Sequence, residues 1–268
     1  ISASGGIIPI PINTNQDFDV TCDQDWLMPS PSQGKRPEYV VVVVEPNLSN
    51  ESRTSEVVIS SDMGEATVTV TQDAVDASLA RWTEKSFASR SLAMRFTATW
   101  CGYCPMMGMA FDIAKDRMGG SLELVSLHGS GSDLEFSGTN QLGRRFAIGG
   151  YPTGVVDARA SIQNYSSYDY TASLVEQVAQ ETKKSYPTVS GIAVDSYLSG
   201  TELTVFVPIY FHKSGSYRVS VLLLEDGIVG YQNGGGSSYT HNDVARYAFT
   251  SMSGESVKIE SDNTVWTN

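Results

Sequence analysis

Cysteine and histidine are scarce in this sequence, with three of each among 268 residues. Three cysteines are too few for a disulfide-rich scaffold. A zinc site needs four ligands, and Cys101 and Cys104 supply only two of them. No paired ligand spacing exists among the other candidate ligands, which are Cys22, His128, His212 and His241. We therefore expect no metal site.

Basic residues and long apolar runs are also few. The 18 Lys and Arg residues are scattered, and 30 Asp and Glu residues give a net charge of -12. Without a basic patch, nucleic acid and anionic lipid are poor partners. No stretch approaches the roughly 20 apolar residues of a membrane-spanning helix. The first six residues form no signal peptide, so we expect a removed leader and membrane attachment only through a lipid anchor absent from this chain.

What the sequence does contain is a closely spaced cysteine pair, Cys101 and Cys104. It follows an apolar run, residues 92–98, and precedes a helix-like run, residues 106–118. A helix N-terminus carries unpaired N–H groups and partial positive charge, which stabilise a thiolate. A second thiol two residues further on can resolve a mixed disulfide. The pattern favours redox chemistry, although an inert structural disulfide is an alternative.

The run from Trp100 to Pro105, Trp-Cys-Gly-Tyr-Cys-Pro, resembles the active site of the thioredoxin superfamily. About fifty residues later, the run Tyr151-Pro152-Thr153 resembles the cis-proline loop of that superfamily. The resemblance implies a cis Tyr151–Pro152 bond and contact between Pro152 and the cysteine pair.

The same resemblance implies roles for individual residues. Cys101 would attack the substrate, and Cys104 would resolve the mixed disulfide. The surface that meets the substrate would be formed by Trp100, Tyr103, Tyr151 and Pro152. No dissociable cofactor is required for this chemistry.

Two residues near the pair call for separate interpretation. Many thioredoxins place a buried acid six residues before the first cysteine, where this chain has Arg95. Arg95 either points to solvent or lies under the site and favours the thiolate. His128 ends the next expected strand, residues 122–127, so it should lie at the same end of the sheet. It is either a proton carrier or a loop histidine without a role.

The first 75 residues indicate a small β-sandwich. Five β-branched runs are separated by loops rich in Gly, Pro, Asn and Ser. The expected strands are residues 7–12, 18–22, 39–44, 56–60 and 66–71. The segment resembles the BACON domain, an immunoglobulin-like module of envelope proteins whose name proposes carbohydrate binding. The matching residues are Gly5, Gly6, Trp26, Asn47, Arg53 and Gln72.

Trp26 and Cys22 have two interpretations each. Trp26 could stack on a sugar, but a buried aromatic is the usual anchor of a sandwich core, and we favour the core. We interpret Cys22 as a buried apolar side chain rather than a reactive thiol.

Beyond residue 188 the sequence becomes strand-like again, with expected strands at 191–196, 203–211 and 217–225. Residues 225–232 and 239–246 resemble the C-terminal part of the outer-membrane-protein-28-related family of envelope lipoproteins with thioredoxin-like cores. That resemblance covers about residues 80–268. We interpret His241, Asp243 and Arg246 as parts of a structural turn rather than a polar site.

The fold class that we predict is multidomain α/β plus all-β, in three parts. Residues 1–75 form a BACON-like immunoglobulin-like β-sandwich, and residues 76–187 form a thioredoxin-like domain with the Cys-x-x-Cys pair. Residues 188–268 form a C-terminal β-sandwich. Helices are expected at 78–82, 106–118, 139–146 and 170–184, and Met106, Met109 and Ile113 should face the sheet.

The function predicted from these features is thiol–disulfide exchange with protein thiols or disulfides in the bacterial cell envelope, aided by a redox partner protein. The alternative is a non-catalytic surface lipoprotein that binds glycan or protein through its sandwiches and has a vestigial or structural cysteine pair. The protein is expected to be exported, either periplasmic or attached to the outer membrane.

Overall fold

A computed structural model gives the arrangement of the chain as two compact units. Unit 1 comprises Ile1–Phe87, Val189–Gly215 and Ile259–Asn268, and unit 2 comprises Ala88–Thr188 and Ser216–Lys258. The helix expected at 78–82 lies outside the described residues. The residues that the structure describes are 1–3, 5–34, 38–47, 49, 51–74, 87–163 and 167–266.

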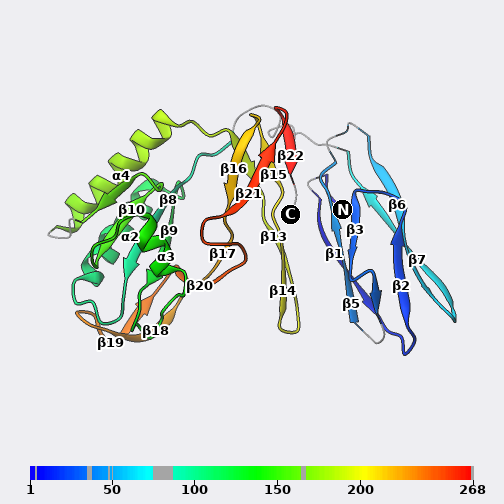
Figure 1. Ribbon diagram of the computed structural model, residues 1–268, viewed down its shortest axis with the longest axis horizontal. Coiled ribbons are helices and arrows are strands. Elements are labelled where there is room, and N and C mark those ends of the chain that lie inside the picture. Colours follow the sequence, from blue (N-terminus) through cyan, green and yellow to red (C-terminus); the bar gives the residue numbers. More distant parts are fainter. Residues whose placement is uncertain are drawn as a thin grey trace. The chain divides into compact units, whose positions relative to one another are not determined.

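Unit 1 begins with a β-sandwich, as the sequence predicts (Figure 1). One sheet has the order β1-β5-β3, and the other has the order β4-β2-β6-β7. Apolar side chains from both sheets form the core between them, together with Trp26 from the turn before β3. The strands are β1 (Gly6–Ile12), β2 (Phe18–Cys22), β3 (Leu27–Ser30), β4 (Gln33–Gly34), β5 (Glu38–Val44), β6 (Arg53–Ser61) and β7 (Gly64–Gln72).

The rest of unit 1 comes from later in the chain. A three-stranded sheet has the order β12-β15-β22, and β13 pairs with β14 as a hairpin. Phe87 packs against the rings of Tyr210 and His212 beside this sheet. The strands are β12 (Ser190–Ile192), β13 (Asp195–Ser199), β14 (Glu202–Phe206), β15 (Ile209–Phe211) and β22 (Thr264–Trp266).

Unit 2 is built on a six-stranded sheet with the order β11-β10-β8-β9-β20-β17. The central strands β8 and β9 are parallel, with a helix between them in the chain, and β10 pairs antiparallel with β8. β20 is parallel to β9 and antiparallel to β17. The strands are β8 (Ser91–Thr97), β9 (Leu122–His128), β10 (Thr153–Val156), β11 (Ala160–Ile162), β17 (Leu222–Glu225) and β20 (Val244–Ala248).

Both faces of this sheet are covered. α2 (Cys104–Met118) and α4 (Tyr168–Ser185) pack on one face, and α3 (Thr139–Arg145) packs on the other. Since side chains alternate along a strand, Ala93 of β8 joins the core with α2 while Phe96 joins the core with α3. On α2 the predicted buried face was wrong at Met109, which is 51% exposed. The fully buried apolar residues of α2 are Met107, Ala110, Phe111 and Ala114.

The last third of the chain differs from the predicted separate domain at 188–268. Its first and last strands belong to unit 1, whereas residues 216–258 belong to unit 2. The reason is hydrogen bonding: β20 extends the sheet of β8 and β9, and Ser126 of β9 donates from its backbone N–H to the carbonyl of Asp243. Unit 2 also contains β16 (Gly215–Val219), β18 (Ile228–Gln232), β19 (Gly236–His241) and β21 (Glu255–Ile259).

Candidate functional site

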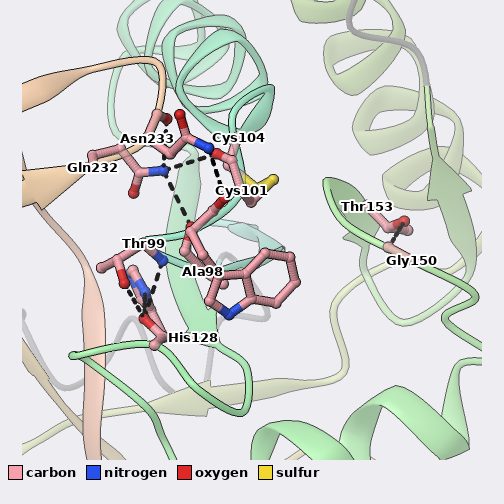
Figure 2. Close-up of a disulfide and its surroundings, with 11 residues drawn as sticks. Ala98, Thr99, Cys101, Cys104, His128, Gly150, Thr153, Gln232 and Asn233 are labelled. Atoms are coloured by element: carbon pink, nitrogen blue, oxygen red, sulfur yellow. Dashed lines mark hydrogen bonds between the residues drawn. A yellow bond between two sulfur atoms is a disulfide. The ribbon is translucent and has the colours of Figure 1, made fainter.

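The cysteine pair lies where the central strand β8 leads into α2. Cys101 and Cys104 form a disulfide with a Cα–Cα distance of 5.4 Å, and Cys104 is the first residue of α2 (Figure 2). Tyr103 is the N-cap residue, and Pro105 occupies the first turn, where a missing N–H is tolerated. The first turn contains no acidic residue. In a reduced pair, this helix terminus would stabilise a thiolate.

Both cysteines are buried to the same degree in the disulfide. Each is 5% exposed, and both pack against Ala98 and the side chain of Tyr151. Exposure in the oxidised pair therefore does not distinguish the attacking cysteine from the resolving one. Little of either cysteine is open to bulk solvent in the disulfide.

The loop that contains Pro152 lies beside the pair. The predicted cis geometry of the Tyr151–Pro152 bond is confirmed. The hydroxyl of Thr153 donates to the carbonyl of Gly150 at 2.7 Å and so closes the loop around the proline (Figure 2). Thr153 then opens β10, opposite Phe96 of β8. Pro152 and Cys104 line the same cavity.

Aromatic side chains surround the pair on the outside. Trp100 is 50% exposed, and Tyr103 is 62% exposed. The indole of Trp100 stacks on the ring of Tyr151 at 5.7 Å and donates from Nε1 to the carbonyl of Ser130 at 3.1 Å. The structure thus places Trp100 against Tyr151, which Pro152 follows directly, while Tyr103 lies at the N-cap of α2 next to Cys104.

A hairpin of the C-terminal segment holds the cysteine loop in place. Gln232, at the end of β18, donates from Nε2 to the carbonyls of Ala98 and Cys101 at 3.1 and 2.9 Å. Asn233 donates from Nδ2 to the carbonyl of Trp100 at 3.0 Å. Figure 2 shows both side chains reaching over the turn that contains the cysteines. The resemblance at 225–232 had pointed to this segment, but nothing in the sequence pattern placed it on the pair.

Arg95 lies under the site and is buried. Its guanidinium donates to the carboxylates of Asp112 and Asp243 at 2.8 and 2.9 Å and to the hydroxyl of Ser126 at 2.8 Å. Lys115 also pairs with Asp243, at 3.1 Å. Of the two interpretations offered by the sequence, the solvent-facing one is wrong. The charge of Arg95 is compensated by these carboxylates, so its effect on a thiolate is reduced.

His128 ends β9 near the pair, as predicted, and it is buried rather than part of an open loop. Its Nδ1 lies 2.9 Å from the hydroxyl of Ser132, which also accepts from the backbone N–H of Thr99. Burial, aided by the nearby charges of His241 and Arg95, lowers the pKa of His128 to about 3. A histidine with this pKa is uncharged at neutral pH and is a weak base.

Trp26 and Cys22, the two residues singled out in the N-terminal segment, are structural. Trp26 is 8% exposed and lies in the sandwich core, with the guanidinium of Arg53 over its ring at 4.3 Å. Cys22 is a free cysteine whose thiol donates to the carbonyl of Leu27 at 2.9 Å, and burial raises its pKa. Within the described ranges, no group of three or more His, Cys, Asp or Glu is arranged to hold a metal ion. Nor does any described helix have the length and apolar character needed to cross a membrane.

Two family models match the chain. Residues 139–268, slightly less than half of it, match Omp28, described as outer membrane protein Omp28. Residues 16–73 match BACON, described as "Putative binding domain, N-terminal". No curated protein matches the chain.

Among solved structures, the chain is similar to HBP35 of Porphyromonas gingivalis, with 17% identity and a TM-score of 0.56. The similarity covers 68% of this chain and 63% of HBP35, and at this identity it concerns the fold alone. A Bacteroides ovatus GH5 xyloglucanase, solved with a XXXG heptasaccharide, aligns over 28% of this chain and 17% of its own. Its identity is 23%, and its TM-score of 0.28 is too low to carry an argument. The chain spans less than two thirds of either protein. It thus joins a BACON region to an Omp28 region, and the Omp28 match identifies it as a protein of the cell envelope.

Proposed function

We propose that this envelope protein exchanges thiols and disulfides with protein partners through Cys101 and Cys104, on a thioredoxin-like domain built around β8 and α2. One observation carries the proposal. The Cys101–Cys104 disulfide lies at the start of a helix, directly after the central strand and beside the loop of Pro152. This placement gives a reduced Cys101 the partial positive charge of a helix terminus.

In the proposed reaction, the thiolate of Cys101 attacks a partner disulfide, and one partner sulfur leaves as a thiolate. Cys104 then attacks the sulfur of Cys101, restores the internal disulfide and releases the second partner sulfur. A partner dithiol of higher reducing power regenerates the pair. Cys104 suits the resolving role because it lies inside the helix, below the outer turn of the loop.

The partner surface is the aromatic surface of Trp100, Tyr103 and Tyr151. Two of these rings are at least half exposed, and aromatic side chains bind strongly at interfaces because they bury a large area with few rotatable bonds. The backbone of Tyr151 would pair with an extended partner segment, as in strand addition.

The test is catalysed reduction of a disulfide-bonded protein by the full chain in the presence of a dithiol. Cys101→Ser should lower the rate to that of the dithiol alone, because the attacking thiolate is lost. Cys104→Ser should trap partners at Cys101, because the resolving thiol is lost. Cys22→Ser is the matched control and should retain the wild-type rate, since Cys22 is a free cysteine of unit 1. Equal rates for wild type and Cys101→Ser would contradict the proposal.

A second function, binding of glycan or protein by the N-terminal sandwich, is favoured by the BACON match and its description. None of the matches names an oxidoreductase, so they support binding more directly than exchange. Trp26 is unsuited to stack on a sugar because it is buried. A groove that includes Asn13, Thr14 and Glu65 offers polar groups instead.

Retardation of the full chain in gels that contain neutral polysaccharides tests this second function. Glu65→Ala is the informative variant because it lines the groove on the exposed side of β7. Retardation that Glu65→Ala removes would support glycan binding through the sandwich. Unchanged migration of the wild type in every gel would leave exchange as the better account.

A further inference from the structure

A small, partly open cavity lies beside Cys104. Its volume is about 40 Å³, which is enough for more than one water molecule because one water needs about 10–15 Å³. Its walls are unusually polar for a space beneath a strand and a helix. They include Arg95, Asp112, Ser126, His128, Gln232, Tyr239 and His241.

The sequence of α2 makes room for this cavity. Cys104, Gly108 and Asp112 are spaced four residues apart, so they share one face of the helix. Gly108 has no side chain between the other two. A Cβ at this position would lie 3.4 Å from the hydroxyl of Tyr239 and 3.8 Å from Nη1 of Arg95. The glycine therefore leaves a polar space that begins at the resolving cysteine.

His241 is a wall residue with one ring nitrogen that lacks a hydrogen-bond partner. It is 5% exposed, and its Nε2 is a buried atom with no partner among the residues that the structure describes. Its ring packs edge-on against the rings of Tyr239 at 4.8 Å and His128 at 5.4 Å. Burial lowers the pKa of His241, and a hydrogen bond with the backbone of Tyr231 offsets part of that lowering. That bond must use Nδ1, so Nε2 carries the free lone pair.

Among the other titratable walls, Asp112 already pairs with Arg95 at 2.8 Å and has a side chain 55% exposed to solvent, and the remaining three are poorer proton acceptors. Arg95 has donors only and already binds two carboxylates. His128 uses Nδ1 with Ser132, and its pKa of about 3 makes it a weak base. Burial raises the pKa of Tyr239, which therefore stays protonated at neutral pH.

We propose, resting on the exchange function above, that His241 accepts the proton of the Cys104 thiol through water in this cavity. In the mixed disulfide between Cys101 and a partner protein, Cys104 is a thiol. Its proton passes to Nε2 of His241 as its sulfur attacks the sulfur of Cys101. The Cys101–Cys104 bond forms, and the bond from Cys101 to the partner breaks. The partner sulfur leaves as a thiolate, so the pair is oxidised, the partner is reduced, and the imidazolium later returns its proton to solvent.

The surroundings of His241 keep the imidazole neutral and ready to accept this proton. Burial lowers the pKa of His241, so that the ring is uncharged at neutral pH. A neutral base positioned near a thiol accelerates its deprotonation. The titratable and charged groups of the neighbouring elements include Arg95 of β8, Asp112 and Lys115 of α2, His128 of β9, Tyr239 of β19, Asp243 before β20 and Arg246 of β20.

The experiment resolves the two thiols in time, using the full chain with Cys22→Ser as background. The reduced protein is mixed with dithiobis-nitrobenzoate, which releases one coloured thiolate when Cys101 attacks and a second when Cys104 resolves. His241→Phe keeps an aromatic ring for packing but removes the acceptor. We expect its second phase to slow by at least about tenfold between pH 6 and 7 while its first phase is unchanged, because only resolution uses the base. The difference should shrink at higher pH, where hydroxide deprotonates Cys104.

His212→Phe is the matched control. His212 is also buried, packs between aromatic rings and has an unpartnered Nε2, but it lies in unit 1. Both of its phases should match the background protein. Gly108→Ala is a second test that leaves His241 intact. Its methyl group would enter the cavity at ordinary van der Waals distances and displace water, so it should slow the second phase alone.

Three results would overturn the proposal. One is a second phase in His241→Phe with the wild-type rate and pH profile. Another is equal slowing of both phases, which indicates a structural role. The third is a shifted pH profile in Asp112→Asn but not in His241→Phe, which would assign the proton to Asp112. A wild type that releases no second thiolate would instead contradict the exchange function itself.

Discussion

Two tryptophans, one in each unit, show how differently the two parts of the molecule use the same side chain. Trp26 is 8% exposed and fills the core between the sandwich sheets. Trp100 is 50% exposed and stacks on Tyr151 beside the cysteine pair. A tryptophan that is left half in water next to a reactive group stabilises the fold little, so its position points to contact with a partner.

Buried polar groups separate the two regions in the same way. Among its described residues the sandwich buries no charged side chain, and its two buried amides, Asn47 and Gln72, donate to backbone carbonyls. Beneath the cysteine pair, by contrast, an arginine, two histidines and an aspartate are buried together: Arg95, His128, His241 and Asp243. Burying such groups is costly unless each is paired, so a cluster of them beside a disulfide points to chemistry more than to packing.

The sharpest test of this comparison is substitution of each tryptophan by alanine. Trp26→Ala should lower the free energy of unfolding by about 3–5 kcal/mol, because a large core side chain leaves a cavity. Trp100→Ala should lower it by about 1 kcal/mol or less, because half of the ring is already in water. Urea denaturation followed by circular dichroism measures both values. Equal losses would remove the distinction between the two regions.

The buried ion pairs should give the next largest effect. Arg95→Met should destabilise unit 2 by about 3 kcal/mol, because Asp243 would be left as a buried charge without its closest partner. Arg90→Met is the matched control, since the Arg90–Glu123 pair is exposed at both ends and should contribute less than about 1 kcal/mol. A loss as small as that of the control would mean that the cluster is not held by its charges.

Loss of the hairpin contact should have a smaller effect. Gln232→Ala removes the donor to the carbonyls of Ala98 and Cys101 and should lower the free energy of unfolding by about 2 kcal/mol. Because that donor holds the cysteine loop, the reduced variant should also show faster hydrogen exchange at the amide of Cys101. Wild-type exchange at this amide would show that the hairpin does not constrain the loop.

The smallest effect, counted per pH unit, is a pH dependence of the free energy of unfolding. The pKa of His128 falls from 6.5 to about 3 on folding, so the unfolded chain binds a proton that the folded chain does not. Stability from this group is complete above pH 6.5 and declines as the pH falls toward 3, by up to about 1.4 kcal/mol per pH unit. Carboxylates contribute to the same acid range, so the measured quantity is the difference in slope between wild type and His128→Asn. Equal slopes from pH 6.5 to 4 would contradict the burial account.

Much of the fold was predictable because it rests on local patterns. The β-branched runs of the sandwich and the apolar run before Cys101 marked strands at their observed places. The helix expected at 170–184 is observed as α4, with Val175 and Ala179 on its buried face. The buried face of α2 was harder to predict, because methionines lie on more than one side of this helix. Only packing in the folded chain decides that Met107 is buried and Met109 is exposed.

The site was predictable only in its outer part. Cys101, Cys104 and Pro152 belong to short motifs that can be recognised in the sequence, and the structure brings them together. Gln232 and His241 lie more than a hundred residues further along the chain, and His241 was interpreted as part of a turn. Their approach depends on long-range pairing of β20 with β9, which no local pattern encodes. The glycine at 108 was likewise uninformative until the cavity beside it was seen.

The central claim is that the disulfide beneath Trp100 is a working redox couple and the N-terminal sandwich is not part of it. Equilibration of the full chain in buffers of graded dithiol-to-disulfide ratio tests this most directly, with Cys101 and Cys104 counted by alkylation. We predict a single reversible transition in which both thiols appear together as a two-electron couple, unchanged by Trp26→Phe. A pair that stays oxidised at the most reducing ratio, while the chain remains folded, would contradict the account and leave a structural disulfide in a binding protein.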